Sequence, residues 1–235
     1  VTDGLADVQP DIWSVQETKL AQDVFPTDEL TALGYESAHF GQGRWNGVAI
    51  MSRVGLTDVV SNFDASVEQD HEALIISATC GGVRVSSVYV PNGRALDNDH
   101  YTYKLSWMAR LRQHLDATCS PSDDVIVTGD FNIAPEDREV FDITKFEGAT
   151  HVSQAERDSL ATVCEFGLTD TFRLFHNEDK LYSWWDYREF AFKRNRGLRI
   201  DHILVSSALV KSVTACVIDK APRKNERPSD HTPVI

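Results

Sequence analysis

The stretch Ala-Leu-Ile-Ile-Ser-Ala-Thr-Cys-Gly-Gly-Val-Arg-Val-Ser-Ser-Val-Tyr-Val, residues 73–90, decides the fold class. Its two halves, Ala73–Thr79 and Val83–Val90, are rich in Val and Ile, which are typical of strands. Gly81 and Gly82 between them suit a tight turn, because glycine adopts positive φ angles without steric cost. The sequence therefore predicts a hairpin, so at least part of the sheet is antiparallel.

Outside this hairpin, further short apolar or alternating runs have the strand pattern, at residues 11–15, 47–51, 124–128, 200–205, 213–218 and 232–235. Two longer segments have the helical period instead. Asp99–Leu115 carries apolar residues on one side, and Ser153–Phe166 opens with a Ser153/Glu156 capping box and stops before Gly167. This pattern predicts an α+β fold, a four-layer α/β sandwich of two mainly antiparallel sheets packed face to face with helices outside.

Length and composition bound the class of protein. The chain has 235 residues, 42% hydrophobic and 25% charged, as in a packed globular protein. It shows no repeat, low-complexity tract or linker, so we expect a single domain over residues 1–235. It has neither a signal-peptide pattern nor an apolar run near the ~18 residues of a membrane span. The four scattered cysteines indicate reduced thiols, and these features together predict a cytoplasmic protein.

Charge is unevenly distributed along the chain. The net charge of −13 by itself argues against a nucleic-acid partner, because cationic side chains supply most non-specific DNA affinity. From Lys180 to Ile235, however, 11 Lys and Arg stand against 6 Asp and Glu, a net charge of +5. This segment permits a basic face on an acidic body. A merely solvated surface is the alternative, and composition does not choose between the two.

Oxygen-rich side chains recur where the expected strands begin or end, and the set comprises Glu17, Asp130, Asn132, Asp201, Asp230 and His231. Strand ends can converge on one rim of a sandwich, and carboxylates with an amide suit a hard cation such as Mg²⁺. Singly, each has a plainer explanation: Asp130 and Asn132 as turn caps, His231 as a solvated loop residue, Tyr89 as a core aromatic. Their joint occurrence favours a metal site.

The order of motifs resembles the exonuclease III family of the endonuclease/exonuclease/phosphatase superfamily. The matching stretches are QETK (16–19), WNGVAI (45–50), YVPNG (89–93), GDFNIAP (129–135), GLTDTFR (167–173), YSWWDYR (182–188), NRGLRIDHIL (195–204) and PSDHTPV (228–234). They cover nearly the whole chain in the family's order. The resemblance implies a DNase I-like sandwich and a DNA repair phosphodiesterase that incises DNA 5′ to abasic sites and removes nucleotides or blocking groups from 3′ ends.

The sequence departs from the family's pattern at its ends. Family members begin with a strand carrying an Asn that helps to hold the metal, and a helix follows it. This sequence starts around that helix and stops inside the last strand, so we expect residues 1–235 to lack the N-terminal strand and the extreme C-terminus of the family's domain.

The resemblance implies Mg²⁺ as the cofactor, with Mn²⁺ as a possible substitute, and Glu17 as its primary ligand. The other residues expected at the metal are Asp130, Asn132, Asp230 and His231. The residues expected to act in catalysis are Tyr89, Asp130, Asn132, Asp201 and His231.

Within that set, Asp130 would orient or deprotonate the attacking water, and His231 would contact a phosphate oxygen while Asp201 fixes its tautomer. Tyr89 and Asn132 would donate hydrogen bonds to the phosphate or the leaving group. Whether His231 acts as the base instead stays open, because these groups would titrate together.

The aromatic and basic stretch Tyr182–Arg199 is expected to contact double-stranded DNA. Trp184 would form the wall of an abasic-sugar pocket, and the cations expected to hold phosphates are Arg188, Lys193, Arg194, Arg196 and Arg199. Trp185 is explained about equally well as a buried core aromatic. Asn46 and Arg94 are expected on the other side of the cleft. We expect a monomer that binds DNA with abasic sites or 3′ ends, and no membrane.

Two alternatives stay open at this point. Another phosphodiesterase of the superfamily, DNase I-like or acting on lipid or inositol phosphates, would share the metal-and-histidine core, although the Tyr182–Arg199 stretch suits DNA better. A catalytically impaired DNA-binding homologue is the alternative from a different class. The presence of Glu17, Asp130 and His231 argues against this alternative, because a site that has lost catalysis has no physical need for clustered charge.

Overall fold

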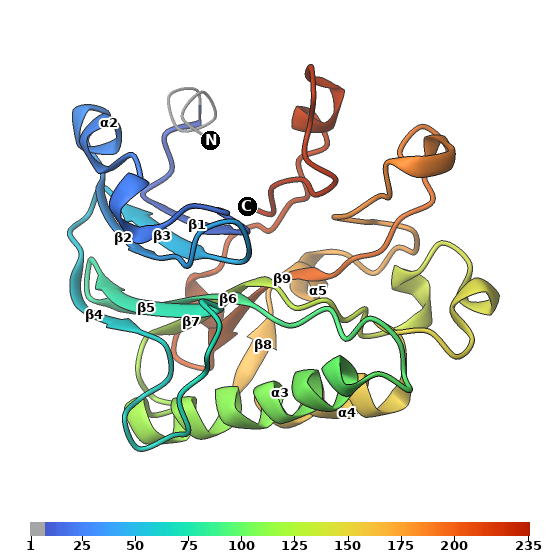
Figure 1. Ribbon diagram of the computed structural model, residues 1–235, viewed down its shortest axis with the longest axis horizontal. Helices are drawn as coiled ribbons and strands as arrows, with labels where there is room; N and C mark the ends of the chain where they lie inside the picture. The colour runs from blue at the N-terminus through green and yellow to red at the C-terminus, as the bar shows by residue number, and fades with distance from the viewer. Residues whose placement is uncertain (1–7) are drawn as a thin grey trace.

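Two β-sheets lie face to face in the structure, a computed structural model that describes residues 8–235 (Figure 1). The smaller sheet has three antiparallel strands in the order β1 (Ile12–Gln16), β3 (Val48–Ser52) and β2 (Glu36–Phe40). The larger has six strands in the order β4-β5-β6-β7-β9-β8. Their bounds are β4 (Thr57–Ser61), β5 (Ile75–Cys80), β6 (Val83–Tyr89), β7 (Val125–Asp130), β8 (Leu168–Asp170) and β9 (Asp201–Ser206). Within this sheet β6 and β7 run parallel, and the other neighbouring pairs are antiparallel.

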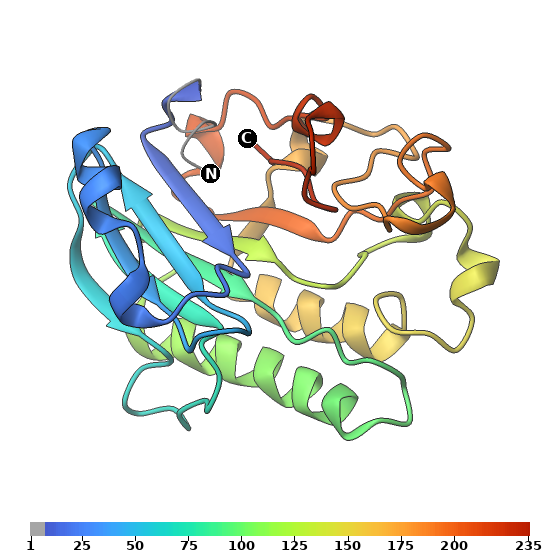
Figure 2. The same ribbon diagram turned by 45° about the horizontal axis from the view of Figure 1, so that its top comes forward.

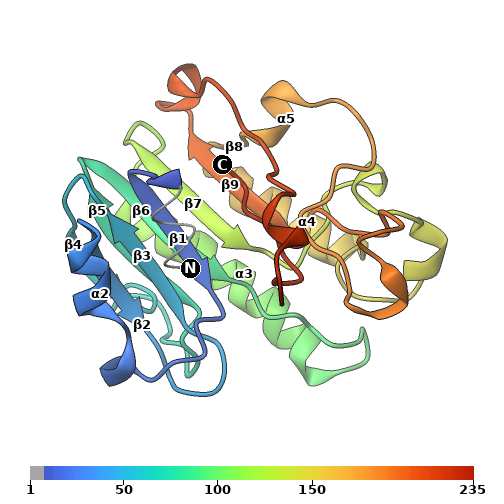
Figure 3. The ribbon, with the colours of Figure 1, turned by 90° about the horizontal axis from the view of Figure 1, so that it is seen from above.

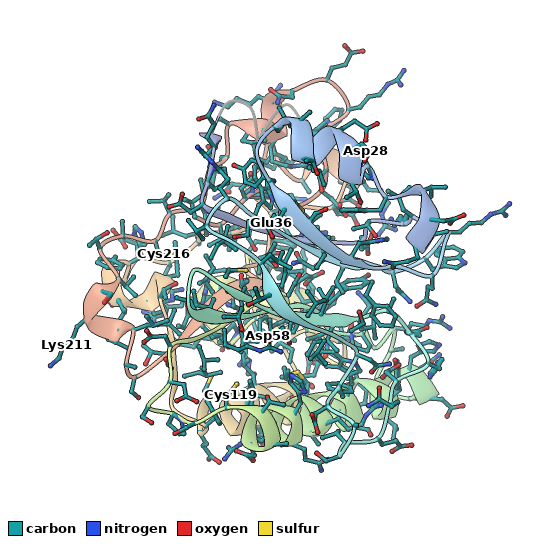
Figure 4. All side chains as sticks on the ribbon, turned by 90° about the vertical axis from the view of Figure 1, so that its left-hand side faces the viewer. Asp28, Glu36, Asp58, Cys119, Lys211 and Cys216 are labelled. Carbon is teal, nitrogen blue, oxygen red and sulfur yellow. The ribbon has the colours of Figure 1, made fainter. Side chains whose placement is uncertain are left out.

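Helices cover the outer faces of both sheets. The long helices α3 (Asp99–Thr118) and α4 (Gln154–Cys164) lie along the larger sheet, and the short α2 (Thr27–Ala32) lies on the smaller one. From the side, Asp28 on α2, Glu36 on β2, Asp58 on β4 and Cys119 beyond α3 mark the successive layers (Figure 4). The remaining helical segments are α5 (Phe172–Phe175) and short 3-10 turns at Gln22–Val24, Asp137–Glu139, Ile143–Phe146, Arg188–Phe190, Val210–Ser212 and Pro222–Lys224. The four-layer α+β sandwich expected from the sequence is confirmed.

Three apolar clusters hold these layers together. The largest packs α3 and α4 against the larger sheet and includes Trp107, Met108 and Leu111, all fully buried. A second lies between the sheets, where Ile50 of β3 meets Ile76 of β5. The third packs α2 on the outer face of the smaller sheet. Both faces of β3 are therefore buried, which explains its continuous apolar sequence.

The expected hairpin is present, with Cys80 of β5 opposite Val83 of β6. Both long helices are also present; the side chain of Asn98 caps α3, and the Ser153/Glu156 capping box opens α4. The strands β2, β4 and β8 escaped prediction, because β4 is largely exposed and β8 has only three residues.

The expectation of strands at residues 213–218 and 232–235 is wrong. These segments pair only with each other, through one bridge between Ile218 and Val234 and the backbone hydrogen bonds beside it, which is too short to form a regular strand. The helix expected near the start of the chain falls mostly on residues 1–7, outside the described part.

Across residues 8–235, none of the helices combines the length and apolar composition that crossing a membrane requires. The four cysteines, all in this range, are free thiols.

Four strand ends meet at one rim of the sandwich. The parallel strands β6 and β7 end side by side at Tyr89 and Asp130, and β9 begins there because Asp201 pairs with Asp130. Strand β1 of the other sheet crosses β6 and β7 and ends at the same place (Figure 3). Gly129 allows β7 to approach β6, because a Cβ at this position would lie 2.0 Å from the carbonyl oxygen of Val88. The long connections around residues 135–150 and 176–200 and the C-terminal segment gather beyond this rim (Figure 2).

Candidate active site at the rim of the two sheets

The C-terminal segment brings His231 to the rim. The backbone N–H of Thr232 donates to the carbonyl of Ser183 at 2.8 Å, and His231 forms a bridge with Trp184. These contacts place the imidazole against the carboxylates that end β7 and begin β9. Residues far apart in the sequence therefore share one site.

His231 lies between two carboxylates. Its Nδ1 is 2.9 Å from Asp201 Oδ2 and 3.0 Å from Asp201 Oδ1, and its Nε2 is 3.7 Å from Asp130 Oδ2. Because an ionised carboxylate only accepts hydrogen bonds, Nδ1 must carry a proton that it donates to Asp201. Asp201 thus fixes the orientation and tautomer of the ring, and Nε2 faces Asp130.

The electrostatics of this trio are unusual. Burial alone would lower the pKa of His231, but the charges of Asp201 and Asp130 outweigh it and raise the pKa to about 10. Burial raises the pKa of Asp130 to about 7, although the neighbouring His231 opposes the shift. His231 is therefore an imidazolium at neutral pH, and Asp130 is a carboxyl group that exchanges its proton near neutrality.

A second group of polar atoms lies where β1 ends. The hydroxyl of Tyr89 donates to Glu17 Oε1, and the Lys19 ammonium lies 2.6 Å from Glu17 Oε2. Burial would raise the pKa of Glu17, but the hydrogen bonds from Lys19 and Tyr89 lower it. Burial and the charges of Asp130 and Glu17 raise the pKa of Tyr89, so its phenol stays protonated. Glu17 is accordingly a charged acceptor, and Tyr89 is a donor.

Asn132 holds the Asp130 carboxylate in place. Its backbone N–H donates to Asp130 Oδ1 at 2.8 Å, and its side-chain amide donates to Asp130 Oδ2 at 3.2 Å and to the Val90 carbonyl at 2.9 Å. Both residues are only 4% exposed. The Asn132 amide is thus engaged in orienting Asp130 in this structure.

The backbone is strained at several of these positions. Glu17, Asn46, Arg94 and Asn132 have φ angles of 52°, 55°, 60° and 51°, in the left-handed region that favours glycine. A non-glycine residue held there costs about 1 kcal/mol or more, and such residues concentrate at functional sites. The sequence carries no direct signal for this strain.

We call Glu17, Asp130, Asp201, Asp230 and His231, with the neighbouring Lys19, the rim cluster. Its four carboxylates face two cations, so the cluster has a formal charge of −2 when every carboxylate is ionised, and Asp130 is half-protonated at neutral pH. Asp130, Asp201 and His231 each offer a ligand atom within 4.8 Å of the others. A surplus of partly buried carboxylates fits a divalent cation. The structure thus contains a candidate acidic metal-binding group.

The two tryptophans of the Tyr182–Arg199 stretch differ in their surroundings. Trp185 is fully buried beside Tyr182, so its interpretation as a core aromatic is correct. Trp184 is half-buried, and its indole Nε1–H donates to Asp230 Oδ2 at 3.0 Å. Trp184 therefore borders the rim cluster directly.

The cations expected to hold phosphates are of two kinds. Arg188 has an 86% exposed side chain paired with Asp186, and Arg196 lies 3.6 Å from Glu189, so both reach the surface. Lys193, Arg194 and Arg94 are also exposed, and Asn46 is half-buried in a loop whose backbone accepts from Lys19. These exposed and half-buried side chains can contact a polyanion.

Arg199 does not reach the surface, so the expectation that it holds a phosphate is wrong. Its side chain is 1% exposed and donates to Glu139 Oε1 at 2.8 Å and to Asp170 Oδ2 at 2.6 Å. Arg173 donates to the same Glu139 oxygen at 2.7 Å, and Arg199 Nη1 lies 2.9 Å from His202 Nδ1. We call Arg173, Arg199, Glu139, Asp170 and His202 the buried network. The sequence gives no sign that an arginine inside a basic stretch points inward.

Sequence reasoning missed several side chains that contact the site; Lys104 Nζ, for example, donates to the Asn132 carbonyl at 2.7 Å. The Ser183 hydroxyl donates to Asp201 Oδ2 at 2.6 Å, and Asn92 Nδ2 donates to Asn132 Oδ1 at 3.2 Å. His151 Nδ1 lies 2.7 Å from the Asn132 carbonyl, and burial lowers the pKa of His151 to about 4. Ser183 and Asn92 lie inside the quoted motifs, so their positions carried a signal. His151 lies outside every motif and carried none.

The chain is similar to known nucleases over its whole length. Residues 1–231 match the model of the Endonuclease/Exonuclease/phosphatase family. Exodeoxyribonuclease III of Haemophilus influenzae is 31% identical over 237 residues, covering 96% of this chain and 89% of that protein.

Solved structures agree closely in fold. An AP endonuclease from Archaeoglobus fulgidus superposes with a TM-score of 0.95 at 34% identity, covering 100% of this chain and 91% of that one. NExo, a 3′-5′ exonuclease from Neisseria meningitidis, superposes with a TM-score of 0.93 at 41% identity, covering 99% and 90%. NExo has also been solved, as a 3′ phosphatase, bound to a product DNA hairpin.

Sequence and fold similarity cover the strands and loops that build the rim cluster. The chain belongs to the endonuclease/exonuclease/phosphatase family, in its exonuclease III and AP endonuclease branch, and is a DNA repair phosphodiesterase of that type.

Proposed function

We propose that this protein is a magnesium-dependent nuclease that removes nucleotides or blocking groups from DNA 3′ ends and incises DNA 5′ to abasic sites. The observation that carries the proposal is the charged His231 held between Asp201 and Asp130 at a rim with surplus carboxylates. Such a site presents a hydrogen-bond donor to a phosphate and a proton acceptor to water within one cluster. Residues 1–235 act as one catalytic domain and as a monomer.

Asp130 is the proposed base. Its pKa of about 7 matches a group that takes a proton from the attacking water at neutral pH. Asn132 orients the Asp130 carboxylate through two hydrogen bonds, so the remaining lone pairs of that carboxylate face the rim. The base left open by the sequence is therefore assigned to Asp130 rather than to His231.

His231 is the proposed donor to a non-bridging phosphate oxygen. A protonated imidazole has no free lone pair, so we place His231 with the phosphate rather than with the metal. Asp201 and Ser183 keep the ring and its partner carboxylate in position. The Tyr89 hydroxyl, which donates to Glu17 in this structure, lies at the end of β6. We assign it as a hydrogen-bond donor to the phosphate or to the leaving oxygen.

The residues that would hold Mg²⁺, or Mn²⁺ in its place, are Glu17, Asp130, Asn132 and Asp230. When bound, the cation neutralises charge on the phosphoryl oxygens and stabilises the departing 3′ oxygen. The surplus negative charge of the rim cluster is the structural reason for expecting it. Oxygen ligands of this kind favour Mg²⁺ over softer metals.

DNA would lie across the rim, between the Asn46 and Arg94 loops and the Trp184–Arg196 segment. Arg188 and Arg196 reach the surface and can exchange their carboxylate partners for phosphates. Trp184, beside Asp230, is the proposed wall for an abasic sugar. NExo, at 41% identity, acts at 3′ ends, which supports 3′-end processing as the leading activity.

The proposal is tested with the full chain on two duplexes, one with an internal abasic analogue and one with a 3′-phosphate at a nick. Both are assayed with Mg²⁺, and again with EDTA in excess. We expect cleavage or phosphate release with Mg²⁺ and none with EDTA. Asp130→Ala should abolish both activities while leaving DNA binding, measured by fluorescence anisotropy, largely intact.

The outcomes separate the alternatives. Activity at the 3′-phosphate alone would restrict the enzyme to 3′ ends. Hydrolysis of a soluble inositol phosphate with neither DNA activity would instead favour the lipid-type phosphodiesterase. Retained DNA binding with no hydrolysis by the wild type would identify the impaired homologue, and the proposal would be rejected.

A further inference from the structure

His202 follows Asp201 on β9 but faces the opposite side of the sheet. Successive side chains of a strand point to opposite faces, so Asp201 faces the rim cluster and His202 faces the helices. Leu204, two residues on, lies in the core formed with α3 and α4, which confirms this direction. His202 is only 2% exposed. It therefore touches no substrate.

Hydrogen bonds fix the protonation pattern of this ring. Arg199 Nη1 lies 2.9 Å from His202 Nδ1, and a guanidinium can only donate, so Nδ1 is the acceptor. His202 Nε2 lies 2.9 Å from the carbonyl oxygen of Ile133, which can only accept, so Nε2 carries the proton. Both ring nitrogens are used, and the ring is neutral.

The donor to this ring is itself immobilised. Arg199 also binds Glu139 and Asp170, and Arg173 binds Glu139. Two guanidinium groups thus meet two carboxylates, and the buried network carries no net charge. A buried polar network whose members are satisfied is rigid. His202 extends this rigidity by one further hydrogen bond to Ile133.

Ile133 belongs to the turn that carries the proposed base. Asp130 ends β7, Asn132 orients its carboxylate, and Ile133 follows Asn132 directly. The Phe131 N–H donates to the carbonyl of Ile200, directly before β9, at 2.9 Å. The bond from His202 to the Ile133 carbonyl ties the other end of the turn to the same strand.

We propose that His202 is a positioning residue for the nuclease reaction, which fixes the turn Asp130–Ile133 through the Ile133 carbonyl and so aims Asp130 and Asn132. The proposal rests on the function proposed above, because it assumes that Asp130 acts in catalysis. A displacement of about 1 Å at a reacting group can lower a rate by about 10²-fold. The buried network thus acts on the rim cluster from the other face of β9.

Three variants test this role. His202→Leu removes both hydrogen bonds at similar volume, whereas His202→Gln keeps an acceptor for Arg199 and a donor for Ile133. The matched control is His114→Leu, because His114 is also buried, 1% exposed, and accepts a hydrogen bond from the Asp64 backbone N–H. His114 lies on α3 and contacts no residue of the rim cluster.

We expect His202→Leu to lower kcat by about 10- to 100-fold with little change in KM. His202→Gln should recover kcat to within a few-fold of the wild type. His114→Leu should lower Tm without lowering kcat. If His202→Leu does not fold, His202→Asn replaces it, because its shorter amide can accept from Arg199 but does not reach Ile133.

Hydrogen exchange of the peptide covering residues 129–135 supplies a readout that needs no activity. Exchange should be faster in His202→Leu, or in His202→Asn, and unchanged in His202→Gln and His114→Leu. A lower Tm with wild-type kcat and wild-type exchange would overturn the proposal and leave His202 a structural residue. If the wild type itself cleaves no DNA, the proposed function fails, and the exchange experiment still decides whether His202 holds the turn.

Discussion

The two faces of β9 carry two polar clusters of opposite character. On one face, the rim cluster is half-exposed and has four carboxylates against two cations. On the other, the buried network pairs two arginines with two carboxylates, and Arg199 and Glu139 are fully buried. Each cluster contains a histidine, and the two are bonded differently: His231 lies between carboxylates, whereas His202 lies between a guanidinium and a carbonyl.

The difference separates a structural cluster from a functional one. Buried charges are normally paired, because an unpaired buried charge is expensive, and the buried network follows this rule. The rim cluster breaks it: burial, with a smaller contribution from Asp201 and Glu17, raises the pKa of Asp130, and the carboxylates of Asp201 and Asp130 raise the pKa of His231. A site that keeps like charges together is destabilised unless a ligand of opposite charge is bound. The imbalance therefore indicates the face on which chemistry occurs.

Removing a carboxylate from the rim cluster should give the largest effect. Asp130→Asn is expected to lower kcat by about 10³-fold, because it removes the base and a metal-facing charge. In the metal-free protein the same change should raise the free energy of unfolding, because it removes a charge that burial disfavours. Single-turnover kinetics check the loss of kcat, and urea denaturation with EDTA present checks the change in stability. A less stable variant would contradict the assigned cost of burying this charge.

The same kind of change in the buried network should act in the opposite direction. Glu139→Gln leaves two guanidinium groups short of a partner and should destabilise the protein by about 3–5 kcal/mol. The control is Asp116→Asn, which removes the exposed pair with Arg112 and should cost less than about 1 kcal/mol. Equal losses in the two variants, measured by urea denaturation, would show that the network contributes no more than a surface pair.

His114, which belongs to neither cluster, shows what burial alone does to a histidine. Burial and the charge of Arg84 lower the pKa of His114 from 6.5 to about 4. Between these values the unfolded chain binds the extra proton, so stability falls as pH falls. Lowering the pH from about 6.5 to about 5 should cost about 1.5 kcal/mol at this residue. His114→Leu should remove that part of the slope, measured by urea denaturation across the range, and an unchanged slope would reject the assignment.

The smallest expected effect concerns the edge of the rim cluster. Trp184→Phe keeps an aromatic ring but loses the hydrogen bond to Asp230, worth about 1 kcal/mol. Incision at an abasic analogue should fall about fivefold, with less change at a 3′-phosphate. Trp13→Phe is the control, because Trp13 packs with the cluster under α2. Equal rates on the abasic substrate would remove Trp184 from the proposed pocket.

Much of the fold could be predicted from local sequence. Residues 73–90 predicted the hairpin and Ser153/Glu156 the start of α4, because both signals are contained in a few neighbouring residues. The strands β2, β4 and β8 were missed, since short or exposed strands owe their existence to a neighbour rather than to their own pattern. The same dependence on partners explains why residues 213–218 and 232–235 form no regular strand.

The candidate site, too, could be predicted only in part. Its residues could be selected from the sequence because Glu17, Asp130 and His231 lie in motifs. The hydrogen bonds and ion pairs between them could not be predicted. Arg199 was assigned to phosphate because it lies in a basic stretch, and the structure buries it against Glu139 and Asp170. His151 lies outside every motif, and His202, although inside one, could not be given a role, because what each does depends on which carbonyl the fold brings to it.

The surplus negative charge of the rim cluster is tested most directly by calorimetric titration of the metal-free protein with Mg²⁺. Saturable binding is predicted for the wild type, weakened at least about tenfold in Asp130→Asn and unchanged in Asp116→Asn. Either no saturable binding by the wild type, or equal affinity in Asp130→Asn, would contradict the account.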